Sequence, residues 1–90
     1  MENIFVFNGS DSSLPSGLFS EFELAKKWIE KYGLTGILTA YPINIGLYDW
    51  AIENHIFDPK KDYQTKARFI QTFTCASVEH YHFENGILEA

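Results

Sequence analysis

Two histidines and a glutamate alternate near the end of the sequence, in the run His80-Tyr81-His82-Phe83-Glu84. Alternate residues of a β-strand lie on the same face, so a strand here would place His80, His82 and Glu84 side by side. Two imidazoles and a carboxylate form a ligand set that zinc or iron accepts. The pattern is short, and structural zinc sites usually have four ligands. The competing interpretation is a solvated strand face, with Tyr81 and Phe83 turned toward the core.

Other reactive side chains carry weaker signals. Cys75 is the only cysteine, which excludes an intramolecular disulfide. It shares its predicted strand face with Phe69 and Phe73, so we expect it to act as a small buried hydrophobe. The serines of residues 10–16 precede a predicted helix, but no glycine motif for phosphate binding accompanies them. The sequence therefore predicts no cofactor and no catalytic set, and enzymatic activity stays undecided.

A mixed aromatic and acidic set lies in the middle of the chain. Aromatic rings surrounded by charges are typical of protein interfaces, where Trp and Tyr dominate the binding energy. The members that we expect to face a basic protein partner are Tyr48, Asp49, Glu53 and Asp58. Trp50 belongs to the same segment, but a chain this small favours a core position for so large a ring.

The distribution of charge narrows the choice of partner. The formal net charge is −5, with three acidic and no basic side chains in residues 43–58 and four basic against one acidic in residues 59–68. A negative surface repels phosphate backbones, so nucleic acid is not the expected partner. A basic protein suits it better, although most acidic surfaces only keep a protein soluble.

Length and composition predict one folded domain over residues 1–90. Hydrophobic residues make up 46% of the chain and aromatic residues 17%, which supports a core without disulfides or metal. The apolar run at residues 4–7 is too short for a secretory signal. No stretch approaches the roughly 20 apolar residues of a membrane span. We therefore expect a cytoplasmic protein without membrane contact.

The elements that must position these residues follow from the apolar periodicity. Residues 4–7 and 36–41 predict strands. An amphipathic helix over about 20–32 is expected to begin at a capping box of Ser20 and Glu23 and to end at Gly33.

The second half of the chain predicts three further elements. A short helix is expected over about 46–55, followed by a polar loop. Alternation over 68–74 and 78–83 predicts two strands in an antiparallel hairpin, after which residues 87–90 fray. The fold class is therefore α+β, with one mainly antiparallel sheet of about four strands, one amphipathic helix packed on it and a short second helix.

Several runs of the sequence are similar to a family of short bacterial proteins of unknown function. The runs that carry this resemblance are FVFNG (5–9), PSGLFS (15–20), AKKWI (25–29), LTGILTAYP (34–42), YDWAIEN (48–54) and EHYHFENG (79–86). The last two are the most specific. The resemblance implies a free-standing bacterial domain and transfers no catalytic residue. In size and charge, the chain also resembles immunity proteins that neutralise basic nuclease toxins.

Three hypotheses for function follow. The leading one is a non-enzymatic protein-binding module, with an immunity or antitoxin-type inhibitor of a basic toxin as its specific form. The alternative is a metal-binding protein or metal-dependent enzyme that uses His80 and His82. The third is a homodimer joined through an exposed edge of the sheet.

Overall fold

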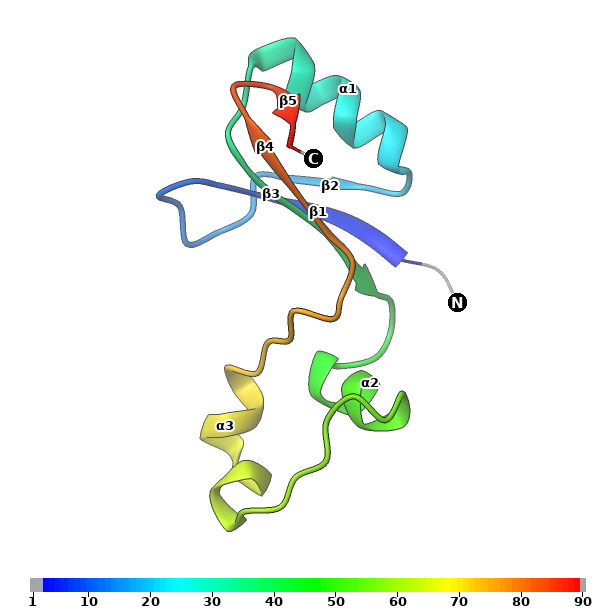
Figure 1. The fold of residues 1–90 in the computed structure, drawn as a ribbon, viewed down its shortest axis with the longest axis vertical. Coiled ribbons are helices and arrows are strands. Elements are labelled where there is room, and N and C mark those ends of the chain that lie inside the picture. The colour runs from blue at the N-terminus through cyan, green and yellow to red at the C-terminus, as the bar shows by residue number, and fades with distance from the viewer. Residues whose placement is uncertain (1–2, 90) are drawn as a thin grey trace. The chain divides into compact units, whose positions relative to one another are not determined.

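A computed structural model of the protein describes residues 3–89, which divide into two compact units. The sheet unit, residues 3–43 and 78–89, contains β1 (Asn3–Gly9), β2 (Gly17–Phe19), α1 (Phe22–Tyr32), β3 (Gly36–Pro42), β4 (His80–Glu84) and β5 (Ile87–Leu88). The helical unit, Asn44–Ser77, contains α2 (Leu47–Glu53), the 3-10 helix η1 (Asp62–Thr65) and α3 (Ala67–Gln71) (Figure 1). That the chain forms a single domain stays a prediction.

The sheet is antiparallel throughout and confirms the predicted α+β class. Its strand order is β2-β1-β3-β4-β5, so it has five strands rather than the four expected. The difference comes from two very short edge strands. β2 lies in a stretch whose Ser, Gly and Pro content is typical of loops. β5 forms because Asn85 and Gly86, both at positive φ, make a tight turn that returns the chain along β4.

The apolar core lies between one face of the sheet and α1. The sheet contributes Phe7, Leu38 and Phe83, and α1 contributes Ala25 and Ile29; all are at most 2% exposed. Ala25 and Ile29 are four residues apart, so they lie on the same face of the helix. Burying a side chain of the size of Ile29 stabilises the fold by about 1.5–3 kcal/mol. This row is the contact that holds helix and sheet together.

Aromatic rings close the rim of this core. The Trp28 ring meets Phe7 edge-on at 5.9 Å between centroids and lies 5.4 Å from Phe19. Phe22 packs in the same way against Phe5 and Tyr81. Trp28 therefore lies on the face of α1 that packs against the sheet, and the predicted packing of this amphipathic helix on the sheet is confirmed.

The start of α1 differs from the prediction. The helix begins at Phe22 with Glu21 as N-cap, and no side chain caps it. The capping box of Ser20 and Glu23 does not form: the carbonyl of Glu21 rather than that of Ser20 accepts at the start of the helix, from the N–H of Ala25. The helix therefore starts two residues later than expected.

The end of α1 is as predicted. Gly33 adopts a left-handed conformation with φ 61°, and its N–H donates to the carbonyl of Glu30. The N–H of Leu34 donates to the carbonyl of Ile29, which completes a Schellman motif. Gly86 lies against this end: a Cβ added to it would come within 3.0 Å of the Gly33 Cα. Glycine at both positions therefore lets the β4–β5 turn approach the helix terminus.

The prediction for residues 58–83 was wrong in part. Residues 68–74 form no strand, because 67–71 are the helix α3, and the expected hairpin is absent from the described residues. Of the two rings that were expected to share a strand face, Phe69 lies in α3 and Phe73 follows its end. The expected polar loop also contains η1, and the short helix expected over 46–55 spans only 47–53.

We predict that Ile29→Ala lowers the free energy of unfolding by about 2–5 kcal/mol, because it leaves a cavity at the centre of the core. Urea denaturation followed by Trp fluorescence measures the loss. Leu24→Ala is the matched control on the same helix: Leu24 is 50% exposed, so its loss should stay within about 0.5 kcal/mol. Equal losses in the two variants would contradict the assignment of the core.

Candidate functional site

His80 and His82 lie together on the sheet. They are exposed on β4, opposite Thr39 and Ile37 of β3, and their ring centroids are 5.4 Å apart. The Nδ1 atom of His80 is 2.8 Å from the carbonyl oxygen of Val78. A carbonyl only accepts, so Nδ1 carries the hydrogen and Nε2 of the neutral ring keeps its lone pair. The pair thus presents at least one nitrogen that can bind a metal.

Glu84 does not complete a metal site with these histidines. It is the last residue of β4 and pairs with Ile87 of β5. Among residues 3–89, no group of three or more His, Cys, Asp or Glu side chains lies close enough together to hold a metal ion. A metal held by His80 and His82 would take its other ligands from water or from another molecule.

The predicted acidic surface is centred on α2. Asp49 and Glu53 are exposed one turn apart on this helix, and neither forms an ion pair with any residue in the described range 3–89. Like charges four residues apart on a helix repel each other, by a few tenths of a kcal/mol. Asp58, beyond the helix, is 3.8 Å from Lys60, and both side chains are more than three-quarters exposed. This exposed pair leaves the carboxylate accessible.

Tyr48, the fourth residue of the predicted surface, is turned inward. It is half-buried, and its hydroxyl donates a 2.8 Å hydrogen bond to the carbonyl of Gln64. Its ring contacts Phe57, Phe69 and Phe73 at centroid distances of 5.5–6.2 Å. In the helical unit, Tyr48 therefore links α2 to the segment around η1 and α3.

A hollow of about 510 Å³ lies beside the end of α2. Its lining residues are Ile52, His55, Ile56, Phe57 and Asp58. Three of these five residues, Ile52, Ile56 and Phe57, are apolar, and Asp58 provides a carboxylate. This combination fits a long basic side chain, whose alkyl stem packs against apolar atoms while its charged end pairs with an acid.

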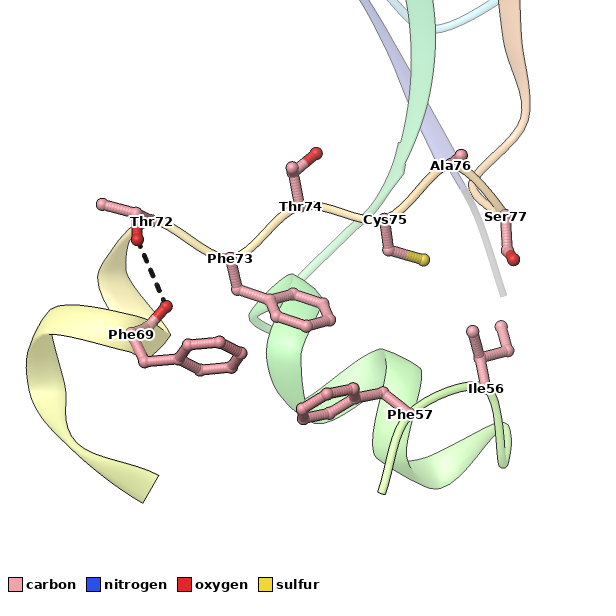
Figure 2. A pocket seen from close by; sticks show the side chains of 9 residues that line it. All are labelled: Ile56, Phe57, Phe69, Thr72, Phe73, Thr74, Cys75, Ala76 and Ser77. Carbon is pink, nitrogen blue, oxygen red and sulfur yellow. Dashed lines mark hydrogen bonds between the residues drawn. The ribbon is translucent and has the colours of Figure 1, made fainter. Parts of the chain in front are cut away.

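A second, open cavity of about 490 Å³ lies between Phe57, α3 and the extended segment that follows α3. Figure 2 shows the rings of Phe57, Phe69 and Phe73 gathered on one side of it and the sulfur of Cys75 directed into the same space. Phe73 and Cys75 thus share one side of the chain, as predicted, but in an extended segment rather than a strand. Cys75 is half-buried.

The sequence interpretation missed this cavity. Its aromatic wall comes from Phe57 and Phe69, which are twelve residues apart and meet at 5.7 Å between centroids. The only signal available was the shared face predicted for Phe69, Phe73 and Cys75. Without the position of Phe57, that signal indicated a buried strand face rather than an open cavity.

Comparison with known proteins gives one match. A family model described as "Domain of unknown function (DUF7710)" matches residues 4–89. The chain belongs to this family. The DUF7710 match includes both units, so the acidic helix α2, the cavity at Cys75 and the histidines of β4 all lie within it. Neither the curated proteins nor the solved structures give a match.

Within residues 3–89, every helix is too short or too polar to cross a membrane.

We predict that Tyr48→Phe destabilises the helical unit by about 1 kcal/mol, because it removes the hydrogen bond to the Gln64 carbonyl. Hydrogen exchange of backbone amides in residues 47–73 measures the effect. Tyr63→Phe is the matched control, since Tyr63 is 57% exposed and its hydroxyl forms no hydrogen bond within residues 3–89. Faster exchange in both variants alike would show that the hydroxyl of Tyr48 has no special role.

Proposed function

We propose that this DUF7710 domain is a protein-binding module that captures a basic protein through the helical unit. The observation that carries the proposal is the hollow beside α2, in which Asp58 stands at the edge of an apolar wall formed by Ile52, Ile56 and Phe57. A lysine or arginine of the partner would fill this hollow and pair with Asp58. Aromatic and basic anchors of this kind contribute most of the energy of protein interfaces.

The charges around the hollow support the same partner. Asp49 and Glu53 are exposed on α2 and have no ion pair within residues 3–89, so their field is not cancelled by a neighbour in contact. Unpaired surface charges steer an oppositely charged protein toward its binding site and fix its orientation. The basic side chains of the unit all lie between residues 60 and 68, and of these Lys60 is 3.8 Å from Asp58 in an exposed pair that a partner's cation can replace.

The specific form of the proposal is an immunity or antitoxin-type inhibitor from a bacterium. An inhibitor of a basic toxin needs an acidic surface that binds tightly and needs no catalytic residue of its own. The overall net charge of −5 and the acidic helix α2 meet this requirement.

We predict that the double variant Asp49→Lys, Glu53→Lys lowers the affinity for the natural partner on the order of tenfold at low salt, because it replaces attraction by repulsion. The partner is identified by affinity purification of the full-length chain and mass spectrometry, then purified for calorimetry. It should be a basic protein whose binding weakens as the salt concentration rises.

Glu23→Lys, Glu89→Lys is the matched control, because it changes the net charge equally through exposed residues of the sheet unit. It should bind nearly as the wild type does. If the two double variants weaken binding by the same factor, only the net charge matters and α2 is not the interface. If the partner is an acidic protein, the proposed complementarity is wrong.

Metal binding by His80 and His82 is the second candidate function. The observation that favours it is the 5.4 Å separation of their ring centroids on the exposed face of β4. Two neutral imidazoles supply half of a tetrahedral zinc set. A site of this kind would be shared with another molecule, such as a second copy of the chain.

We predict that zinc, titrated by calorimetry at pH 7.5, binds to the wild-type protein and not to His80→Ala, His82→Ala. His55→Ala is the control, because His55 belongs to the helical unit and is not part of the pair. Sedimentation of the zinc-loaded protein detects a dimer bridged by metal. Zinc binding that survives the double substitution would remove these histidines as ligands.

A further inference from the structure

We infer that the open cavity at Cys75 binds a small amphipathic organic anion, with its apolar body against Phe57, Phe69 and Phe73 and its charged group at Arg68. This inference goes beyond protein binding: the cavity shares Ile56 and Phe57 with the hollow beside α2, but its other lining residues come from α3 and the segment that follows it. The hollow beside α2 carries the carboxylate of Asp58, whereas the cavity at Cys75 adjoins a hollow that Lys66 and Arg68 line.

The size and lining of the cavity indicate a small molecule. Its volume of about 490 Å³ falls within the range of roughly 300–1,000 Å³ that is usual for small-molecule sites. The ring centroids of Phe57 and Phe73 are 5.1 Å apart. Those of Phe57 and Phe69 are 5.7 Å apart, and these two rings are nearly parallel. The three rings together form a continuous apolar wall. Ile56 extends this wall. An alkyl chain or an aromatic ring fits such a surface.

Few polar groups face the cavity. The side chains of Cys75 and Ser77 point to the same side of the extended segment as Phe73, while Thr74 projects to the other side (Figure 2). The Thr72 hydroxyl is already occupied, since it donates to the carbonyl of Arg68 at 3.0 Å. The body of the ligand should therefore be apolar, with its polar group at one end.

The charge of that polar group follows from the adjoining surface. A hollow of about 450 Å³ lined by Tyr63, Lys66, Arg68, Phe69 and Thr72 shares Phe69 and Thr72 with the cavity. Lys66 is 3.6 Å from Asp62, but Arg68 is exposed and forms no ion pair within residues 3–89. A guanidinium binds a carboxylate or sulfonate through two parallel hydrogen bonds. Arg68 thus provides an anion-binding group in the hollow that adjoins the apolar wall through Phe69 and Thr72.

The single cysteine of the chain makes occupancy measurable, because Cys75 lines the cavity. The full-length protein is treated with N-ethylmaleimide in increasing concentrations of sodium decanoate, and the adduct is followed by intact-protein mass spectrometry. We expect the alkylation rate to fall along a saturation curve, about tenfold when decanoate reaches ten times its Kd, since only the unbound protein reacts. Alkylation of glutathione in the same solutions corrects for direct effects on the reagent.

Two variants test the role of charge. Arg68→Gln should raise the Kd of decanoate roughly three- to fivefold, the effect of one exposed charge pair. It should leave the Kd of the uncharged analogue decanol unchanged. Lys31→Gln is the matched control, because it removes one positive charge from the sheet unit, and its Kd for decanoate should equal that of the wild type.

Three results would overturn the inference. Alkylation that neither decanoate nor decanol slows would mean that the cavity accepts no apolar chain. A decanoate Kd that Arg68→Gln leaves unchanged would mean that the site does not recognise an anion. Alkylation that slows as the protein concentration rises, without any ligand, would mean that a second copy of the chain covers the cavity. None of these results bears on partner capture by Asp49, Glu53 and Asp58, so the two proposals can fail separately.

Discussion

The contact between α1 and one face of the sheet is the interaction on which the sheet unit depends. Ala25 and Ile29 are fully buried against Phe7, Leu38 and Phe83. The other residues of α1 are more exposed to solvent. Because side chains alternate along a strand, burial of this face assigns His80 and His82 to the opposite, exposed face. The position of the histidine pair is therefore a consequence of core packing rather than of any interaction made by the histidines.

The helical unit has a different kind of interior. Among its residues only Ala51 is buried, and the rings of Tyr48, Phe57, Phe69 and Phe73 contact one another while they remain partly exposed. Aromatic rings that pack together but remain partly exposed can contact a ligand or partner. Because their packing already restricts them, they lose little further side-chain entropy on binding. Both proposed binding sites lie in this unit, and they share the apolar side chains of Ile56 and Phe57.

The edges of the sheet bear on the hypothesis of a homodimer. β2 has three residues and β5 has two, so each edge offers few free backbone groups for another strand. Very short edge strands are one way in which proteins avoid pairing with copies of themselves. An association through zinc at His80 and His82, or through the cavity at Cys75, would not require a free edge.

The sequence by itself determined the elements whose signals are local. Apolar periodicity predicted the amphipathic helix α1, Gly33 predicted its end, and alternation predicted β3 and the shared face of His80 and His82. Tertiary structure alone decided the conformation of segments whose periodicity fits both a helix and a strand. It also decided which residues far apart in the chain contact each other. It placed Phe69 on the helix α3 and Phe73 after its end, where both rings contact Phe57, and it started α1 only at Phe22. It also turned Tyr48 inward, since the Gln64 carbonyl that accepts its hydroxyl hydrogen lies sixteen residues away.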